Sequence, residues 1–258
     1  MGAQAAALLG SGVPFGRQRD LEVVSTQVLR APAGYRLRDV ALSHGGTGLA
    51  PWGWDGTAVS TVLDGGAAAR VLPDLTVELS AETDLSELRR ALDLDRSFDE
   101  LWSVAPHCAG EGWELRATSP FAALAQALAA TNTSYRSTQA MLEEIVGDGP
   151  FPPPHAVAAM PLERWGYRAA SLRGLAERVD DTDWDDLDDD ALLLAVQALP
   201  GFGPFAAASV LPLLGRPRAL LVDGWLADQV DDARDYERYG RWGGTVLWLD
   251  VSRRWRRP

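Results

Sequence analysis

Short runs of β-type residues, separated by glycine-rich breaks, occupy the first part of the chain. Runs at 21–29, 58–63 and 75–79 are rich in Val, Leu and Thr, and breaks such as 43–48 are rich in glycine. This pattern predicts half-buried strands joined by turns. Residues 1–19 show little periodicity, so we expect a loose N-terminal extension there.

From about residue 80 onward, the apolar positions recur with helical spacing. Ser119 followed by Pro120 predicts the start of a long apolar helix over 121–130, because proline is favoured at the first helical position. The Gly- and Pro-rich stretch 147–154 predicts a break. Further helices are expected around 85–92, 98–102, 134–145, 156–160, 169–179, 191–199, 204–214, 224–230 and 236–255.

The order of these elements predicts an α+β fold. We expect a small antiparallel β accessory domain over 20–83, followed by a mostly α-helical domain over 84–258. A chain of 258 residues can bury a substantial core. No apolar run approaches the roughly 20 residues that span a bilayer, and the N-terminus lacks the charged lead of a signal peptide. We therefore expect a cytoplasmic protein with no membrane partner.

The net charge of −12 argues against nucleic-acid binding, because cationic side chains normally neutralise the phosphates. The distribution of the charge weakens this objection. Eight aspartates lie between Asp180 and Asp190 and account for −8 of the −12, which leaves −4 on the rest of the chain. A solvated loop and helix start explains this acidic run, and the C-terminal segment 253–257 carries four arginines.

The residue types present limit the chemistry. Cys108 is the only cysteine, so a disulfide within the chain and cysteine-ligated zinc or iron–sulfur sites are excluded. His44, His107 and His155 show no metal-ligand spacing, and we expect no catalytic metal. The chain contains no lysine, because all 24 basic residues are arginine. A mechanism that needs a lysine Schiff base is therefore excluded.

The most specific stretch reads Leu-Pro-Gly-Phe-Gly-Pro at 199–204, between two predicted apolar helices. Gly201 and Gly203 can both take positive φ in a tight turn, and Pro204 fits the first helical position. The free N–H groups at that helix start can bind a phosphate. An ordinary tight turn between two helices is the alternative interpretation.

A lone carboxylate, Asp223, follows this hairpin by about twenty residues, in the sequence Leu-Val-Asp-Gly-Trp. An aspartate in this context can simply cap the next helix. The same carboxylate can also act as a catalytic group on a ligand bound at the hairpin. The two roles are compatible.

These residues resemble the hairpin and catalytic aspartate of the helix–hairpin–helix (HhH-GPD) DNA glycosylase superfamily. The resemblance covers 84–258 and includes the segments 88–95, 112–121 and 236–242. It points to the 3-methyladenine glycosylase II and 8-oxoguanine glycosylase branches. The implied partner is double-stranded DNA that contains a damaged base.

The resemblance also implies a role for each matching position. Asp223 becomes the catalytic residue. The implied protein is a monomer at the bacterial nucleoid that needs no cofactor, although a monovalent cation can bind at the hairpin. The residues placed on the DNA backbone are Gly201, Phe202, Gly203 and Pro204.

In the bifunctional members of the family, a lysine just after the hairpin attacks the sugar and permits strand cleavage. The matching position here is Phe205, and no lysine exists elsewhere to substitute for it. This departure implies a monofunctional enzyme, which removes a base and leaves an intact abasic strand. The missing cysteine quartet also separates the chain from the endonuclease III and adenine-mispair branches.

Two further stretches, Thr-Asn-Thr-Ser-Tyr-Arg at 131–136 and Gly-Tyr-Arg-Ala at 166–169, resemble elements that the 8-oxoguanine branch uses to read the opposite strand. Carried over by position, Asn132 and Tyr167 become wedges that fill the gap left by an extruded base. Arg136 and Arg168 become donors to the unpaired partner base. The alternative is that Tyr167 belongs to the core and Arg136 is a surface charge.

The implied chemistry is hydrolysis of an N-glycosidic bond through an oxocarbenium-like sugar, which the Asp223 carboxylate stabilises while it orients water. Phe205 and Trp225 are expected to line the base pocket, and a cationic alkylated purine stacks well on such rings. We therefore expect removal of an alkylated purine. An 8-oxoguanine-type glycosylase, a non-catalytic DNA-binding or interaction module, and an enzyme with a small-molecule substrate remain alternatives.

Overall fold

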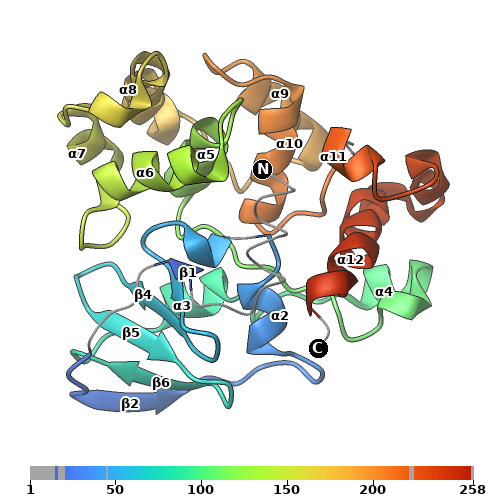
Figure 1. The fold of residues 1–258 in the computed structure, drawn as a ribbon, viewed down its shortest axis with the longest axis horizontal. Helices are drawn as coiled ribbons and strands as arrows, with labels where there is room; N and C mark the ends of the chain where they lie inside the picture. Colours follow the sequence, from blue (N-terminus) through green and yellow to red (C-terminus); the bar gives the residue numbers. More distant parts are fainter. Residues whose placement is uncertain (1–14, 17–20, 45, 221–223, 257–258) are drawn as a thin grey trace.

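The computed structural model describes residues 15–16, 21–44, 46–220 and 224–256. Figure 1 shows an antiparallel sheet at the lower left and a helical body above and beside it. The predicted α+β class is confirmed. One continuous cluster of buried side chains, from Leu29 to Val251, runs through both parts.

Within the described residues, the sheet has six strands in the order β1-β3-β4-β5-β6-β2, and every neighbouring pair is antiparallel. Alternate residues of the central strands are buried, so that Ala69 lies opposite Leu79 and Val71 opposite Val77 on the face turned to the core. The strands are β1 (Phe15–Gly16), β2 (Ser25–Val28), β3 (Gly53–Trp54), β4 (Val59–Val62), β5 (Ala68–Val71) and β6 (Thr76–Leu79).

The predicted runs at 21–29, 58–63 and 75–79 contain β2, β4 and β6, which confirms a strand in each. The pattern does not predict β5, because its Ala-Ala-Arg start lacks the β-branched residues typical of strands. It also does not predict the short helix α2 (Leu37–Ala41), which buries Leu37 and Val40. The accessory part is therefore not purely β.

Helix α5 begins where the sequence signals place it, whereas α7 begins at Pro154, inside the predicted break at 147–154. Ser119 caps α5 by accepting the N–H of Ala122 at 3.1 Å, and Pro120 takes the first helical position. The helical body contains α3 (Ser86–Ala91), α4 (Asp99–Val104), α5 (Pro120–Ala129), α6 (Tyr135–Val146), α7 (Pro154–Ala158), α8 (Arg168–Arg178), α9 (Asp189–Gln197), α10 (Pro204–Leu213), α11 (Gly224–Ala227) and α12 (Gly243–Arg256). The described residues also form 3₁₀ segments. One, η1 (Gly46–Gly48), lies between α2 and β3, and the others lie in the helical body: η2 (Pro106–Cys108), η3 (Glu163–Trp165), η4 (Val179–Asp181) and η5 (Ala233–Trp242).

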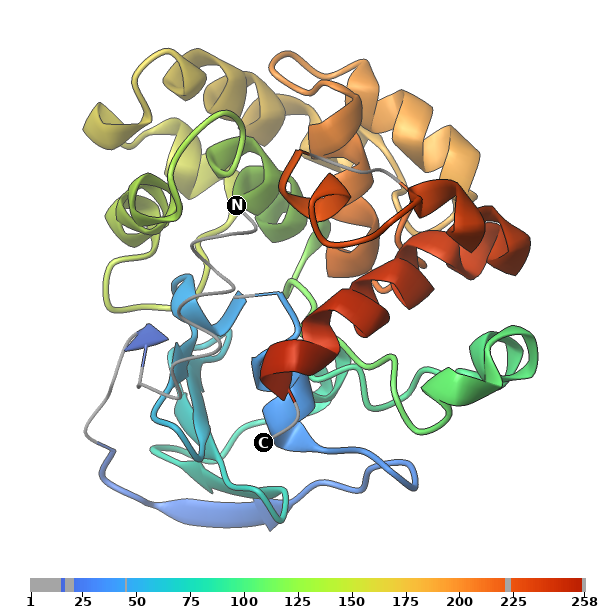
Figure 2. The same ribbon diagram turned by 45° about the vertical axis from the view of Figure 1, so that its right-hand side comes forward.

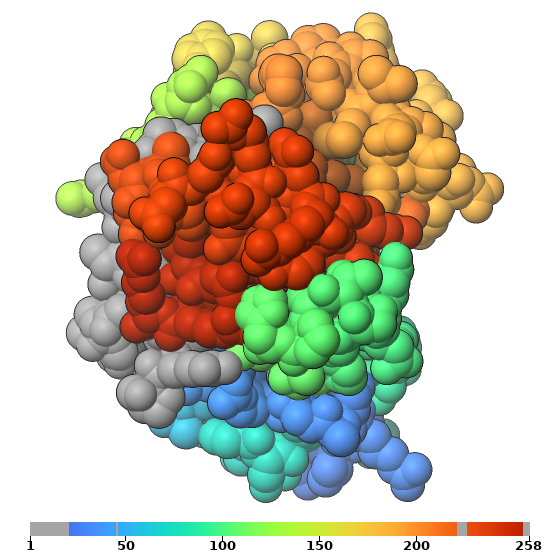
Figure 3. All heavy atoms as spheres, turned by 90° about the vertical axis from the view of Figure 1, so that its right-hand side faces the viewer, coloured from blue at the N-terminus to red at the C-terminus, as the bar shows by residue number. Residues whose placement is uncertain are grey.

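The C-terminal prediction of one helix over 236–255 is wrong. Gly240 has a φ of 57° and interrupts the helical backbone, so η5 precedes a separate α12. Figures 2 and 3 show this segment, in red, between α9 and α10 on one side and α4 on the other. Ion pairs join it to both sides: Arg241 to Asp189 at 3.1 Å and Arg253 to Glu111 at 3.3 Å.

Helix α5 lies at the centre of the helical body. Every residue from Phe121 to Ala129 is buried, and α5 contacts α6, α8 and α10. Small alanines on α5 allow these helices to approach closely, so the elements that carry the candidate site share one packed support. Among the described residues, none of the helices combines the length and the apolar character that crossing a bilayer requires.

Candidate functional site

The hairpin at 199–204 joins α9 to α10, as predicted. Gly201 has a φ of +92°, and a Cβ built on it would lie 3.0 Å from both Leu128 Cδ1 and the Ser171 hydroxyl oxygen. The fold therefore requires glycine at position 201. Phe202 is buried and anchors the turn in the core.

Gly203 differs from the prediction. Its φ of −89° and ψ of 179° are the extended backbone of a helix N-cap, so the expectation of positive φ is wrong here. A Cβ built on Gly203 would meet nothing within 4 Å. Neither backbone conformation nor packing requires glycine at this position.

Helix α10 begins at Pro204, as the sequence predicts, and Pro204 is exposed. The first-turn N–H groups of a helix lack partners within the helix, and together with the helix dipole they favour an anion. Phe205, in the same turn, keeps 45% of its surface exposed. The exposed start of α10 therefore offers N–H donors beside an aromatic ring.

The structure brings together three of the four residues predicted to read the opposite strand. Arg168 is 8% exposed, and its Nη2 donates to the carbonyl oxygens of Thr131 and of Asn132, the latter at 3.3 Å. Its Cζ lies 4.4 Å from the centre of the Tyr167 ring, and Tyr167 is 74% exposed. The alternative that Tyr167 belongs to the core is therefore wrong. Arg136 lies on α6 with an exposed side chain.

The hairpin and the cluster of Asn132, Tyr167 and Arg168 are neighbours in space. Ser171, which the hairpin contacts at Gly201, lies in the first turn of α8 directly after Tyr167 and Arg168. Leu128, the other contact of Gly201, lies at the end of α5 just before the turn that holds Asn132. The hairpin and the Asn132–Tyr167–Arg168 cluster therefore share their support.

Asp223 lies outside the described residues, and the side chain of Trp225 is not described either. The assignments of Asp223 as the catalytic residue and of Trp225 as a pocket wall stay predictions. Helix α11 begins at Gly224, directly after Asp223 in the sequence.

A cluster of buried charged residues contacts the backbone just after the C-terminal end of α10, from where the chain continues towards residue 223. Asp93 is 1% exposed, and its Oδ2 lies 2.8 Å from Arg96 Nη2. Burial raises the pKa of Asp93 to about 6, although Arg96 and Arg116 act in the opposite direction. Arg96 donates to the carbonyl of Gly215 at 2.6 Å, and Arg116 to that of Leu214 at 2.9 Å.

Sequence reasoning does not find this cluster, because its members are separated by up to about 120 residues. One local signal exists: Arg116 falls in the 112–121 segment that carries the family resemblance. A charged residue in a stretch that the fold buries needs a partner, and the partners of Arg116 are Asp93 and the carbonyl of Leu214.

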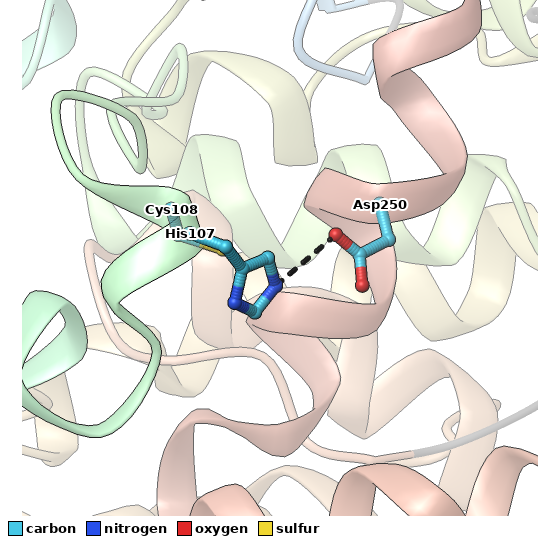
Figure 4. A group of neighbouring side chains, drawn as sticks. All are labelled: His107, Cys108 and Asp250. Atoms are coloured by element: carbon cyan, nitrogen blue, oxygen red, sulfur yellow. Dashed lines mark ion pairs between the residues drawn. The ribbon is translucent and has the colours of Figure 1, made fainter.

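A second polar group lies where η2 meets α12 (Figure 4). His107, Cys108 and Asp250 place one potential metal-ligand atom each within 4.8 Å of one another, although the sequence shows no ligand spacing. The guanidinium of Arg253 already serves this group: it donates to Asp250 and lies 3.4 Å from Cys108 Sγ. Burial raises the pKa of the Cys108 thiol to about 11, so the thiol stays protonated at neutral pH. These residues form an ion-pair cluster that holds α12 against η2.

No protein-family model and no curated protein matches the sequence. The structure is similar to an 8-oxoguanine glycosylase/lyase of Clostridium acetobutylicum in its apo-form, with a TM-score of 0.67 and 16% identity over 90% of this chain and 99% of that one. MBOgg1 in complex with a low-affinity DNA ligand gives a TM-score of 0.65 at 16% identity, over 93% and 99% of the two chains. The 3-methyladenine DNA-glycosylase of Archaeoglobus fulgidus gives 0.61 at 16% identity, over 88% and 97%.

These structural neighbours are DNA glycosylases of the helix–hairpin–helix type. The present chain has their fold over nearly its whole length, which confirms the fold that the sequence resemblance implies. At 16% identity the likeness concerns the fold, and the lesion that each neighbour removes belongs to that neighbour.

Proposed function

We propose that this protein is a monofunctional DNA glycosylase that removes a damaged base from double-stranded DNA. The observation that carries the proposal is Gly203, because nothing in the part of the chain that the structure describes requires glycine there. A glycine at an open, exposed helix start lets another backbone approach the N–H groups closely. A DNA phosphate fits this position, and the fold supports the same conclusion.

The distribution of charge is compatible with DNA at the hairpin. The acidic run at 180–190 precedes and begins α9, whereas the hairpin follows the other end of that helix. Nine residues of helix separate the two ends by about 14 Å, which exceeds the Debye length of about 8 Å at physiological salt. Asp189 is also paired with Arg241 and Arg216.

In the proposed reaction the damaged nucleotide leaves the stack, and its base departs from the sugar. The Asp223 carboxylate stabilises the oxocarbenium-like sugar and orients a water molecule, which adds to C1′. The departing base takes the electron pair of the N-glycosidic bond, and the Asp223 carboxylate accepts the proton that the water loses as its oxygen bonds to C1′. Because no lysine is present, no lysine Schiff base with the sugar forms, and in the proposed reaction the strand remains intact with an abasic site.

An alkylated purine is the proposed substrate class. The exposed Phe205 ring replaces an amine nucleophile, and a positively charged base stacks favourably on an aromatic face. A second candidate is an oxidised purine such as 8-oxoguanine. The assembled cluster of Asn132, Tyr167 and Arg168 favours it, since the resemblance ties these positions to that branch.

The test is a set of duplex oligonucleotides, each with one alkylated or oxidised base, incubated with the protein and then treated with hot alkali. The proposal predicts strand breaks at one lesion class, and only after alkali. Breaks without alkali, or a borohydride-trapped covalent complex, contradict the monofunctional mechanism. Salt-sensitive DNA binding without base release at any lesion indicates a non-catalytic module.

A further inference from the structure

One edge of the antiparallel sheet, formed by strand β2, is uncovered. Strand β2 pairs with β6 on one side and ends the strand order, so its other side has no neighbouring strand among the described residues. Figure 1 shows β2 at the lower border of the molecule, with no described helix beyond it. A strand edge of this kind presents unpaired N–H and C=O groups that can pair with another strand.

The hydrogen bonds between β2 and β6 show which backbone groups of β2 point to the free edge. The N–H of Leu29 donates to the carbonyl of Leu75 at 3.0 Å. Along an antiparallel ladder, the residues that bond to one neighbouring strand alternate with those that point away from it. The N–H and C=O groups of Thr26 and Val28 therefore point to the free edge.

The residues along this edge include none of the types that prevent strand pairing. Segment 23–29 contains no charged residue and no proline, which are the residues that block exposed edges in natural sheets. Val24 and Val28 keep 65% and 71% of their surface exposed, and they lie on the same face of the strand as Thr26. On a protein with a net charge of −12, a second copy can approach this uncharged edge without close repulsion between like charges.

The charges that flank the segment indicate which partner fits. Glu22 and Arg30 are both exposed, and neither has an ion-pair partner among the described residues. Two copies of the segment can pair antiparallel with Thr26 opposite Thr26. Glu22 of each copy then lies opposite Arg30 of the other, and Val24 lies opposite Val28. The segment is thus complementary to itself in both charge and apolar surface.

The backbone favours the same register. Because the N–H and C=O groups of Thr26 point to the free edge, the Thr26 residues of two copies can exchange a pair of hydrogen bonds. In a register centred one residue earlier or later, Glu22 would lie opposite Val28 or Pro32 and lose the ion pair. The register centred on Thr26 therefore satisfies the backbone and the side chains together.

We propose that β2 is a homodimerisation edge, at which two copies of this chain pair antiparallel and form one continuous sheet across a two-fold axis. The inference is independent of the proposed enzymatic function, and it departs from the monomer that the family resemblance implies. Strand β2 and the helices α9 and α10 lie at opposite ends of the molecule (Figures 1 and 2), so pairing leaves the hairpin of both copies accessible. The interface is short, so the dimer is weak and forms as concentration rises.

The test reverses the flanking charges singly and together, and follows the full chain by sedimentation velocity from about 1 to about 500 µM. We expect the wild type to shift from monomer to dimer over this range. Glu22→Arg and Arg30→Glu should each raise the Kd of the dimer about tenfold, because each turns two attractive cross-strand pairs into repulsive ones. The double variant with both reversals should restore the wild-type Kd.

The single reversals change the net charge in opposite directions, so an effect of total charge alone would weaken one dimer and strengthen the other. Arg178→Glu is the matched control, because Arg178 is exposed on α8 and its reversal changes the net charge as Arg30→Glu does. We expect Arg178→Glu to leave the Kd within about twofold of the wild type.

A wild type that stays monomeric over the whole range overturns the inference. Single reversals that leave the Kd unchanged, or a double variant that associates as weakly as the single ones, overturn it too. Val28→Lys tests the edge without using the ion pair: the side chain is exposed, so folding should persist, while the new charge at the edge should abolish the dimer. A dimer that persists in Val28→Lys places the contact elsewhere and contradicts pairing at β2.

Discussion

Gly201 in the hairpin packs directly against Ser171 in the first turn of α8, at a distance that leaves no room for a Cβ. Because Tyr167 and Arg168 precede Ser171 by one helical turn, the hairpin and the exposed tyrosine are held on one rigid support. A DNA backbone bound at the hairpin would therefore place the duplex in a fixed relation to Tyr167.

Gly201→Ala should destabilise the protein. The alanine must adopt a φ of +92° and displace Leu128 or Ser171, which together cost about 1–3 kcal/mol. Chemical denaturation followed by tryptophan fluorescence measures this loss. An unfolding free energy equal to that of the wild type contradicts the close packing of the turn.

Gly203→Ala is the matched control, and it should separate folding from DNA binding. Its Cβ meets no atom of the protein, so we expect a stability change below about 1 kcal/mol. A DNA phosphate at the helix start would meet the new methyl group, so the Kd for duplex DNA should rise about tenfold, equivalent to about 1.4 kcal/mol. Unchanged DNA affinity would exclude a close backbone approach at Gly203.

Tyr167→Ala should slow base release without affecting folding. The ring is 74% exposed and contacts Arg168 through a cation–π interaction, so its removal should change stability by less than about 1 kcal/mol. A ring that stacks in the gap of an extruded base contributes about 1–3 kcal/mol, and its loss should lower the single-turnover rate about 5- to 150-fold. Tyr167→Phe keeps the ring and should keep the rate; if it is as slow as the alanine variant, stacking is not the role of Tyr167.

Because of Asp93, the free energy of unfolding should fall as pH rises, the opposite of the effect of an aspartate whose pKa is lowered by an ion pair. Its pKa rises from the ordinary 3.8 to about 6 because of burial, so between these values the folded state holds a proton that the unfolded state releases. The free energy of unfolding of the wild type should therefore fall as pH rises through this window, by about 3 kcal/mol relative to Asp93→Asn. Denaturation of both proteins at pH 4, 5, 6 and 7 tests this, and parallel pH profiles contradict a raised pKa.

The local parts of the candidate site could be predicted because their signals are local. Proline at the first helical position and a serine before it mark α5, and Gly201 and Pro204 mark the hairpin. The same reasoning is wrong for Gly203, since the extended backbone of a helix N-cap serves the turn equally well. Strand β5 could not be predicted from the sequence, because its alanines form a strand only by pairing with β4 and β6.

The non-local parts could not be predicted, because nothing in a single sequence reports which distant charges meet. Glu114 and Arg218 form an ion pair although they are 104 residues apart in the sequence. In the same way, His107 in η2 contacts Asp250 in α12, which is distant in the sequence. Arg168 illustrates the difference. Its position could be predicted from the Gly-Tyr-Arg stretch, whereas its bonds to the carbonyls of Thr131 and Asn132 come from the fold.

The Asp223→Asn variant tests whether Asp223 is the catalytic carboxylate of a DNA glycosylase. For a lesion that the wild type processes, the single-turnover rate of base release and the Kd for an abasic-site analogue are measured for both proteins. If Asp223 is catalytic, the rate should fall at least about 100-fold, because the neutral amide cannot stabilise the sugar cation, and the Kd should stay nearly unchanged. A near-normal rate of base release in Asp223→Asn would contradict this role.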